Sequence, residues 1–274
     1  FGGIRFMKQV PNLFTLLNLF FGCIAIVFIM QVDSGIMTID ETTGNPIVFF
    51  PERMAFGALF IFFAAAVDFL DGFFARMLKA STDKGKQLDS LSDVVSFGVA
   101  PGMIIYQLLR LGFAEGTNGL ERSFLLLLPA FLFTCSVAWR LAKFNVSTNQ
   151  SDSFKGVPSP AAGLVVASFP LIVWYEYFGL QRLFINPWVL YGTVVLLSFL
   201  MVCNRTFIAI KFKDFSFKNN LLKYILISIS LICLVSLQWF AIPVIFVLYL
   251  VFSAFSKVPA PIVHTNDKTL DATV

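Results

Sequence analysis

Residues 68–93 read DFLDGFFARMLKASTDKGKQLDSLSD and place four carboxylates in a chain that is otherwise rich in apolar residues. Asp68 and Asp71 are three residues apart, so on a helix they share one face. Asp89 and Asp93 are four residues apart, which again gives a shared face. The polar run between the two pairs contains a glycine and is typical of a short turn between antiparallel helices. We therefore predict a helical hairpin whose inner seam is acidic.

Such a cluster of acids in a membrane-like sequence indicates a metal site. An aspartate at the centre of a spanning helix costs about 2.5–3.5 kcal/mol, and several together require a compensating cation. Oxygen ligands without histidine or cysteine suit Mg²⁺ or Mn²⁺. Two pairs on facing helices can hold two ions about 3.5–4 Å apart, a geometry that binds the attacking and leaving oxygens of a phosphoryl displacement. Solvated helix ends would explain one such aspartate but not four, so we predict all four as metal ligands.

The residues beside the first acid pair fit the same chemistry. Gly72 and Ala75 leave the helix surface bare next to Asp71, so a bulky ligand can approach the backbone. The alternative is ordinary packing of small residues between helices. Arg76 follows one turn after Gly72 and can bind a phosphate or a metal-bound carboxylate, or it can anchor the helix at the membrane surface. The neighbouring acids favour the binding role.

The composition excludes an ordinary soluble domain. Hydrophobic residues make up 58% of the 274 positions and charged residues only 13%, which is typical of an integral membrane protein. The net charge of +4 is small and gives no indication of nucleic-acid binding. The four cysteines are scattered in apolar runs without paired spacing, as expected for reduced, buried side chains.

Apolar runs alternate with polar segments along the chain, and a spanning helix needs about 17–25 largely apolar residues. We therefore predict an all-α, polytopic bundle of about eight transmembrane helices. The last two runs form a tight hairpin or, as the less favoured alternative, one long tilted helix. In this interpretation residues 1–256 form one membrane catalytic domain, and residues 257–274 form a polar C-terminal tail. The apolar runs cover residues 11–30, 54–78, 87–109, 124–141, 161–178, 187–202, 221–237 and 240–255.

The basic residues predict the orientation of these helices. If the amino terminus lies in the cytoplasm, most lysines and arginines fall in cytoplasmic segments, and the exceptions are Arg53, Arg110, Arg122 and Arg182. The positive-inside rule then places the acids near the cytoplasmic face of a multi-pass protein of the cell (inner) membrane.

A polar stripe opens the first apolar run. Pro11 suits the first turn of a helix, and Asn12, Thr15 and Asn18 follow at three-residue spacing on one face. These side chains can cap the helix and form hydrogen bonds between helices, or they can line a ligand pocket.

The acidic stretch resembles a known family signature. Residues 68–93 spell Asp-x-x-Asp-Gly-x-x-Ala-Arg, then eight residues, then Gly-x-x-x-Asp-x-x-x-Asp. This pattern is similar at every fixed position to the signature of the CDP-alcohol phosphotransferases. The continuation at residues 87–101, QLDSLSDVVSFGVAP, resembles the phosphatidylserine synthase branch of that family.

The resemblance implies a reaction and a donor site. Members of this branch transfer a phosphatidyl group from CDP-diacylglycerol to the hydroxyl of L-serine and release CMP, which implies Asp93 as the general base. Relatives begin with a similar Pro-Asn-x-x-Thr segment, which implies that Asn12 and Thr15 contact the nucleotide. Direct in-line attack needs no nucleophilic side chain, and no Ser/His or Cys/His set indicates a covalent intermediate. The residues expected to bind CDP-diacylglycerol are Asn12, Thr15, Asp68, Gly72, Ala75, Arg76, Thr82 and Gly85.

A second cytoplasmic segment is a candidate for binding the acceptor. A zwitterionic amino acid needs a cation for its carboxylate, and Arg140 and Lys143 lie at the end of the fourth apolar run, where a positive-inside anchor is the alternative. Synthases of this branch carry a similar Arg-Leu-Ala-Arg-Phe-Asn stretch, which implies serine binding by Arg140, Lys143 and Asn145. Lys143 stands where an arginine is usual, so a bidentate carboxylate contact is lost there.

Two other functions fit part of this pattern. The same chemistry can use another acceptor, such as glycerol phosphate, inositol or inositol phosphate, or an archaeal-type lipid donor. An acceptor that carries phosphate would require a denser basic pocket. A cation-coupled transporter also places aspartates in membrane helices, but the chain has no two halves with matching broken helices. The resemblance further implies a homodimer in the lipid bilayer, with CDP-diacylglycerol and L-serine as substrates.

Overall fold

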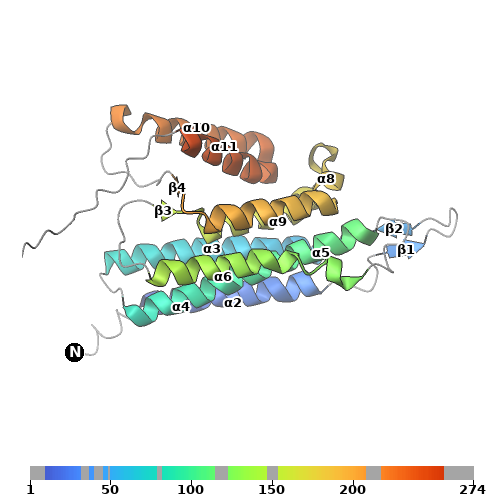
Figure 1. Ribbon diagram of the computed structural model, residues 1–274, viewed down its shortest axis with the longest axis horizontal. Coiled ribbons are helices and arrows are strands. Elements are labelled where there is room, and N and C mark those ends of the chain that lie inside the picture. The colour runs from blue at the N-terminus through green and yellow to red at the C-terminus, as the bar shows by residue number, and fades with distance from the viewer. Residues whose placement is uncertain are drawn as a thin grey trace, which may run out of the picture.

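The computed structural model describes residues 10–31, 37–39, 46–48, 50–78, 82–114, 123–146, 154–207 and 217–255. Long helices lie side by side along one axis, and a helical hairpin forms a separate layer over them (Figure 1). Each of the eight predicted apolar runs contains a helix, so the prediction of an all-α polytopic membrane protein is confirmed. The bundle contains α2 (Val10–Met30), α3 (Glu52–Met77), α4 (Asp83–Val94), η1 (Val95–Val99), α5 (Ala100–Ala114), η3 (Phe124–Leu126), α6 (Ala130–Val146), α7 (Ser159–Trp174), η4 (Tyr177–Gly179), α8 (Gln181–Ile185) and α9 (Pro187–Val202).

The remaining elements are the outer hairpin and two short ribbons. Figure 1 shows one ribbon, formed by β1 and β2, at the end of the bundle opposite to the start of α4. The outer hairpin consists of α10 (Phe217–Leu237), η5 (Gln238–Phe240) and α11 (Ala241–Phe255). The ribbons are β1 (Met37–Ile39) with β2 (Pro46–Val48), and β3 (Phe154–Lys155) with β4 (Thr206–Phe207).

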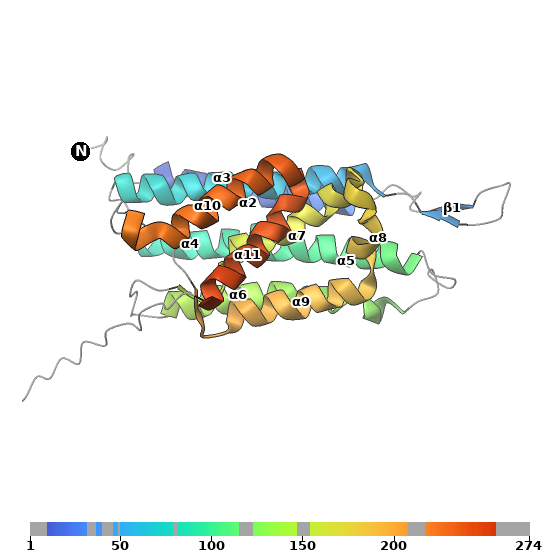
Figure 2. The same ribbon diagram turned by 90° about the horizontal axis from the view of Figure 1, so that it is seen from above.

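Several helical segments are long and apolar enough to cross a membrane. In addition, Ser159–Trp174 and Pro187–Val202 are shorter apolar helices. The long apolar segment nearest the C-terminus, Tyr224–Ala254, is not one straight helix. Gln238 adopts a φ of 49°, and α11 turns back against α10 (Figure 2). The predicted tight hairpin is therefore confirmed, and the alternative of one tilted helix is wrong. The four long segments are Pro11–Met30, Glu52–Ala75, Asp83–Ala114 and Tyr224–Ala254.

Helices α2 and α3 pack closely because small side chains lie at their contact. A Cβ atom on Gly57 would lie 2.6 Å from Ile29 Cγ1, so a larger residue would force the helices apart. Nearer the acids, the rings of Phe14 and Phe74 stack with their centroids 5.1 Å apart. These contacts fix the polar stripe of α2 against the acidic half of α3.

A π turn at η1 interrupts the helix that carries the second acid pair. Two neighbouring helices hold it in place: Ser96 Oγ donates to Asn18 O at 3.1 Å, and Thr134 Oγ1 donates to Gly98 O at 2.9 Å. A π turn contains one residue more than an α-helical turn. The residues on one side of it therefore face a different direction from the one that an uninterrupted α-helix of the same sequence would give them. As a result α4 directs its acids towards α2 and α3, while α5 is buried among the other helices.

The ribbon of β3 and β4 ties the start of α7 to the end of α9. Gly156, which follows β3, donates its N–H to Arg205 O at 2.9 Å. Its φ of 77° favours glycine, and a Cβ atom here would lie 2.4 Å from Met201 O. The first turn of α7 is therefore held in a fixed position beside α4 and α6.

Candidate active site

Three of the four acids come together between α3 and α4. One carboxylate oxygen from each of Asp68, Asp89 and Asp93 lies within 4.8 Å of the other two. Asp93 is the most buried of the three, at 7% exposed. Like charges about 4 Å apart repel by about 4 kcal/mol at an effective dielectric constant near 20, so a bound cation would stabilise three ionised carboxylates here. Oxygen donors at this spacing fit a hard divalent cation such as Mg²⁺ or Mn²⁺.

Asp71 turns towards α2 and lies beside this cluster. Its Oδ2 accepts a hydrogen bond from Thr15 Oγ1, and its side chain is buried. Ser92 Oγ donates to Thr15 O at 3.1 Å, which fixes α4 against the same turn of α2. Asp71 is therefore not one of the three acids of the close cluster, and its role as a metal ligand stays a prediction.

Asn18 lies beside the acids, although the sequence named it only as a possible pocket or hydrogen-bonding residue of the polar stripe and not among the predicted site residues. Its side chain is fully buried, and its Nδ2 donates to Asp93 Oδ1 at 3.4 Å. Its Oδ1 is buried without a hydrogen-bond partner among the described residues. The three-residue spacing from Asn12 was the feature that could have identified it. Asn18 holds the Asp93 carboxylate in place and leaves one acceptor free inside the site.

The predicted nucleotide residues gather where α2 and α4 begin. Thr82 caps α4, because its Oγ1 accepts the N–H of Gly85 at 3.0 Å. A Cβ atom on Gly85 would lie 3.1 Å from Asn12 Oδ1 and 3.1 Å from Thr82 Oγ1, which shows how close the three residues are. Their roles in binding CDP-diacylglycerol stay predictions.

The surface of α3 beside the acids is open at Gly72. A Cβ atom there would meet no described atom within 4 Å, so this glycine does not serve helix packing. Ala75 is half-buried on the same helix, and the side chain of Arg76 lies outside the described part of the structure. The open surface agrees with the prediction that a ligand approaches the backbone here.

A cavity of about 300 Å³ lies on the other side of the acids. Arg140 and Asp93 both line it, and their opposite charges attract each other. Arg140 Nη1 donates to Ser159 Oγ at 3.0 Å. The Nε of Arg140 is buried and has no partner among the described residues. At the rim, Asn145 Nδ2 donates to Ser90 Oγ at 2.9 Å. The cavity is lined by Lys86, Asp89, Ser90, Asp93, Arg140, Leu141, Phe144, Asn145, Pro158, Ser159 and Pro160.

A sequence profile described as CDP-alcohol phosphatidyltransferase matches residues 8–203. The chain belongs to this family. The matched region is more than half of the chain and includes both acid pairs, the polar stripe of α2 and the cavity. The protein is therefore a membrane-embedded transferase. The match ends before the outer hairpin begins at Phe217.

Relatives in the family come from bacteria, archaea and a yeast. The chain is 34% identical to the CDP-diacylglycerol--serine O-phosphatidyltransferase of Helicobacter pylori (strain J99) over 233 residues, or 76% of this chain and 90% of the relative. It is 36% identical to the enzyme of the same name from Bacillus subtilis over 133 residues, 47% of this chain and 70% of the relative. It is also 35% identical to the archaetidylserine synthase of Methanothermobacter thermautotrophicus over 115 residues, 41% of this chain and 45% of the relative.

Lys143 is not among the residues that line the cavity, and its predicted role in serine binding stays a prediction. Its Nζ donates to Asn204 Oδ1 after the end of α9, and the side chain is exposed. The rotation of α6 explains this, because residues three apart on a helix differ by about 60° in direction and only one of them points at α4. The sequence had not assigned Lys86, Ser90 or Ser159 to the site, although the first two share the helix face of Asp93.

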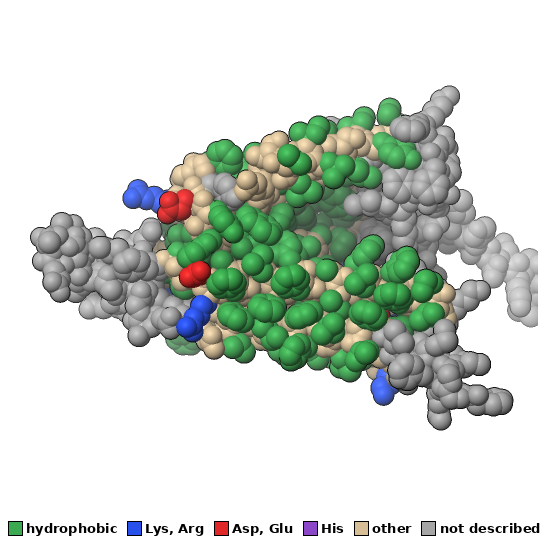
Figure 3. Space-filling view, turned by 180° about the vertical axis from the view of Figure 1, so that it is seen from behind, with side chains coloured by type: hydrophobic (Ala, Val, Ile, Leu, Met, Phe, Trp, Pro, Cys, Tyr) green, Lys and Arg blue, Asp and Glu red, His purple; other side chains and the backbone are tan. Residues whose placement is uncertain are grey.

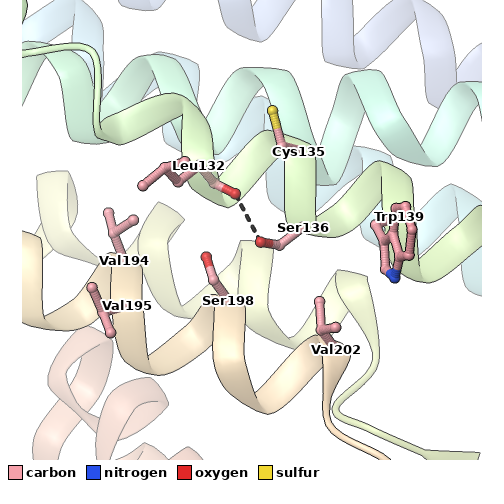
Figure 4. Close-up of a pocket in the computed structure, with 8 residues that line it drawn as sticks. All are labelled: Leu132, Cys135, Ser136, Trp139, Val194, Val195, Ser198 and Val202. Carbon is pink, nitrogen blue, oxygen red and sulfur yellow. Dashed lines mark hydrogen bonds between the residues drawn. The ribbon is translucent and has the colours of Figure 1, made fainter.

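A larger cavity, of about 460 Å³, lies between α6 and α9. Figure 4 shows that Val194 and Val195 face Leu132 and Ser136 across it. Its lining residues include no acidic or basic side chain. Among the described residues, the acids therefore line the first cavity and not this one.

Proposed function

We propose that this protein transfers the phosphatidyl group of CDP-diacylglycerol to the hydroxyl of L-serine, giving phosphatidylserine and CMP. One observation carries the proposal: a half-buried arginine, Arg140, lines the 300 Å³ cavity together with two acids of the cluster, Asp89 and Asp93. A small acceptor with a carboxylate at one end and a hydroxyl at the other fits this arrangement. The names of the bacterial relatives support serine as that acceptor.

The donor side is built from the acid cluster. We propose that two divalent ions, Mg²⁺ or Mn²⁺, bind at this cluster. Their ligands would be Asp68, Asp89 and Asp93, together with Asp71 beside them. When bound, these ions neutralise the diphosphate of the donor and stabilise the charge on the departing CMP. Asn12, Thr82 and Gly85 lie where the nucleotide would approach the ends of α2 and α4, with Gly72, Ala75 and Arg76 along α3.

Asp93 is the proposed general base. It lines the acceptor cavity, is almost fully buried and is held by the side-chain amide of Asn18. It takes the proton of the serine hydroxyl as the serine oxygen attacks the β-phosphorus of the donor. The phosphorus–oxygen bond to CMP breaks in the same displacement, so no covalent enzyme intermediate forms.

Arg140 is the proposed partner of the serine carboxylate. Its Nη1 is held by Ser159, which fixes the guanidinium, and its Nε retains an unused donor inside the protein. A charge-assisted hydrogen bond to a carboxylate is about twice as strong as one between neutral groups. Asn145 lines the rim and completes the polar surroundings of the acceptor.

Other acceptors define the alternatives. Glycerol phosphate or inositol phosphate would bring a second negative charge, whereas the cavity offers Arg140 and Lys86 as its cations. An archaeal-type lipid donor is compatible with the similarity to an archaetidylserine synthase. Membership of a transferase family argues against the transporter alternative.

We propose the remaining features from the sequence. The protein crosses the cell membrane several times as one catalytic domain, residues 1–256, and its acids face the cytoplasm because the basic segments lie on that side. The polar tail at residues 257–274 lies outside the described residues. The working form is a homodimer.

The test is an assay of the purified protein with CDP-diacylglycerol and Mg²⁺ or Mn²⁺. L-Serine, glycerol 3-phosphate, inositol and inositol phosphate are supplied in turn, and CMP and the lipid product are measured. CMP release that depends on serine supports the proposal. Release with a different alcohol would move the protein to another branch of the family, and no release with any of them would overturn the proposed activity.

A further inference from the structure

The 460 Å³ cavity between α6 and α9 has no part in the proposed reaction. Figure 4 shows Leu132 and Val194 at one end of this cavity and Trp139 and Val202 at the other. Leu132 and Trp139 are each more than half exposed, so the cavity opens to the surroundings of the bundle. In a membrane protein, these surroundings are the hydrocarbon chains of the lipids.

The hydroxyl of Ser198 lies in the middle of this cavity, on the α9 side. Its Oγ is buried and forms no hydrogen bond with any described residue. Facing it from α6, Ser136 Oγ donates to Leu132 O of its own helix at 2.8 Å (Figure 4). A buried hydroxyl without a partner is unfavourable. The hydroxyl of Ser198 is therefore available to an acceptor group that enters the cavity.

Two basic residues lie beyond the Trp139 end of the cavity. Lys143 follows Trp139 by one turn of α6, and its Nζ donates to Asn204 Oδ1, two residues after Val202. Arg205 is the next residue along the chain, and its side chain is exposed. Among the described residues, the partner of the Lys143 ammonium is a neutral amide, so no described acid compensates its charge. Lys143 and Arg205 form the basic rim of the cavity.

The basic rim lies at the level of a membrane surface. Figure 3 shows hydrophobic side chains across the middle of one face of the molecule, with charged side chains near its ends. Helix α6 ends at the same end of the bundle at which α4 begins (Figure 1). Leu132 and Lys143 are eleven residues apart, or about 16 Å along α6. This length is close to half of a hydrocarbon core about 30 Å thick, so the cavity and its rim together span one leaflet.

We propose that this cavity binds one anionic phospholipid of the bilayer, at a site separate from those of the donor and the acceptor. An acyl chain fills the cavity, its ester group supplies an acceptor for Ser198, and the phosphate binds at the basic rim. Basic pockets between transmembrane helices bind anionic head groups in this way. A positive-inside anchor alone would explain Lys143, but it would explain neither the cavity beside it nor the unpaired hydroxyl.

The first test measures lipid selectivity at Trp139. The purified protein in detergent is titrated with phosphatidylglycerol or phosphatidylcholine, each brominated near the glycerol end of one acyl chain. Quenching of Trp139 is the difference between the wild type and Trp139→Phe. We expect half-maximal quenching at about a tenfold lower mole fraction of phosphatidylglycerol, because phosphatidylcholine carries no net charge to bind at the rim.

The second test removes the basic rim. The double variant Lys143→Gln, Arg205→Gln should reduce the preference for phosphatidylglycerol to less than about twofold. Glutamine at position 143 keeps a donor for Asn204, so the contact between α6 and the end of α9 can be retained. The matched control is Arg53→Gln, Arg182→Gln, which removes the same charge at the opposite end of the bundle and should keep the full preference (Figure 1).

The third test fills the cavity. Ser198→Leu replaces an unpaired hydroxyl by a larger apolar side chain, so it removes no hydrogen bond between described residues. We expect half-maximal quenching of Trp139 by phosphatidylglycerol to require about a tenfold higher mole fraction, because the added side chain occupies the space of the acyl chain. Ser236→Leu on α10 is the matched control, since Ser236 is exposed and bonds only within its own helix.

Four outcomes would overturn the site. Equal quenching of the wild type by both lipids would show bulk lipid only, and no quenching by either would show that another group covers the cavity. A preference that survives the loss of the basic rim, or quenching that is unchanged in Ser198→Leu, would also contradict the proposal. None of these measurements uses CDP-diacylglycerol or serine, so their result is independent of the proposed function.

Discussion

At the residue scale, the central feature is the position of Asp93 between Asn18 and the cavity. Asn18 on α2 binds one side of its carboxylate, and the cavity with Arg140 opens on the other. A carboxylate held in this way can remain in one orientation while a hydroxyl approaches it. Under the proposed mechanism, Asn18 would orient the base and Arg140 would bind the acceptor, so the two functions are carried by different residues.

Asp93→Asn should abolish turnover. The amide keeps the size of the side chain but cannot accept the proton, and general-base catalysis contributes about 10²–10⁴-fold. CMP release is measured with both substrates at saturation, and donor binding is measured separately with labelled CDP-diacylglycerol. Binding should be largely retained, and turnover close to that of the wild type would remove Asp93 from the role of base.

Arg140→Gln should raise the KM for serine with little change in the KM for the donor. Loss of a hydrogen bond to a charged group costs about 1.5–3 kcal/mol, or about 10- to 150-fold in affinity. Lys143→Gln is the matched control, since Lys143 binds Asn204 outside the cavity. Initial rates over a range of serine concentrations check both variants, and an equal effect in the two would contradict the placement of the serine carboxylate at Arg140.

The spacing of the acids predicted which of them share a helix face, and three of the four lie together in the structure. It could not predict that Asp71 turns to Thr15 or that Lys143 binds Asn204, because these partners lie 56 and 61 residues away along the chain. Such contacts depend on the rotation of one helix against another. The amide of Asn18 reaches Asp93 for the same reason.

At the element scale, the contact of α2 with the π turn determines where the two acid-bearing helices meet. Gly22 on α2 lies against Ser96, and Ser96 donates to Asn18 O one turn earlier. No sequence pattern in residues 95–99 predicts a π turn, since it arises from contacts with α2, α6 and α7. The hairpin of α10 and α11, by contrast, was predictable from the short gap between two apolar runs.

Gly22→Ala should destabilise the protein. A Cβ atom there would lie 2.3 Å from Ser96 Oγ and 3.0 Å from Ser96 Cα, so the helices must separate. Overpacking of this kind costs about 1–3 kcal/mol. Thermal unfolding in detergent measures the effect. Gly192→Ala on α9 is the control, because a Cβ atom there meets no described atom within 4 Å and should not lower the melting temperature.

At the scale of the whole molecule, the proposed function gives the two substrates separate routes to the acids. The open surface at Gly72 leads to them from the face of α3, whereas the cavity proposed for the acceptor lies between α4, α6 and the first turn of α7. A lipid donor can therefore remain bound while a water-soluble acceptor enters from the other side.

Steady-state kinetics should accordingly indicate a ternary complex. Double-reciprocal plots of CMP release against serine, at several fixed donor concentrations, should intersect because both substrates bind before either product leaves. Isotope exchange between CMP and CDP-diacylglycerol should require serine. Parallel lines, or exchange without serine, would indicate a covalent intermediate and contradict direct attack.

The π turn also limits how this helix can be altered by evolution or by engineering. Closing the turn at Val95–Val99 to regular α-helical hydrogen bonds without removing a residue would rotate everything before it by about 100° relative to α5. Asp89 and Asp93 would then face away from Asp68, although every side chain of the acid motif would still be present. A graft of the motif onto another membrane helix must therefore include residues 83–102 as one unit, with their number unchanged.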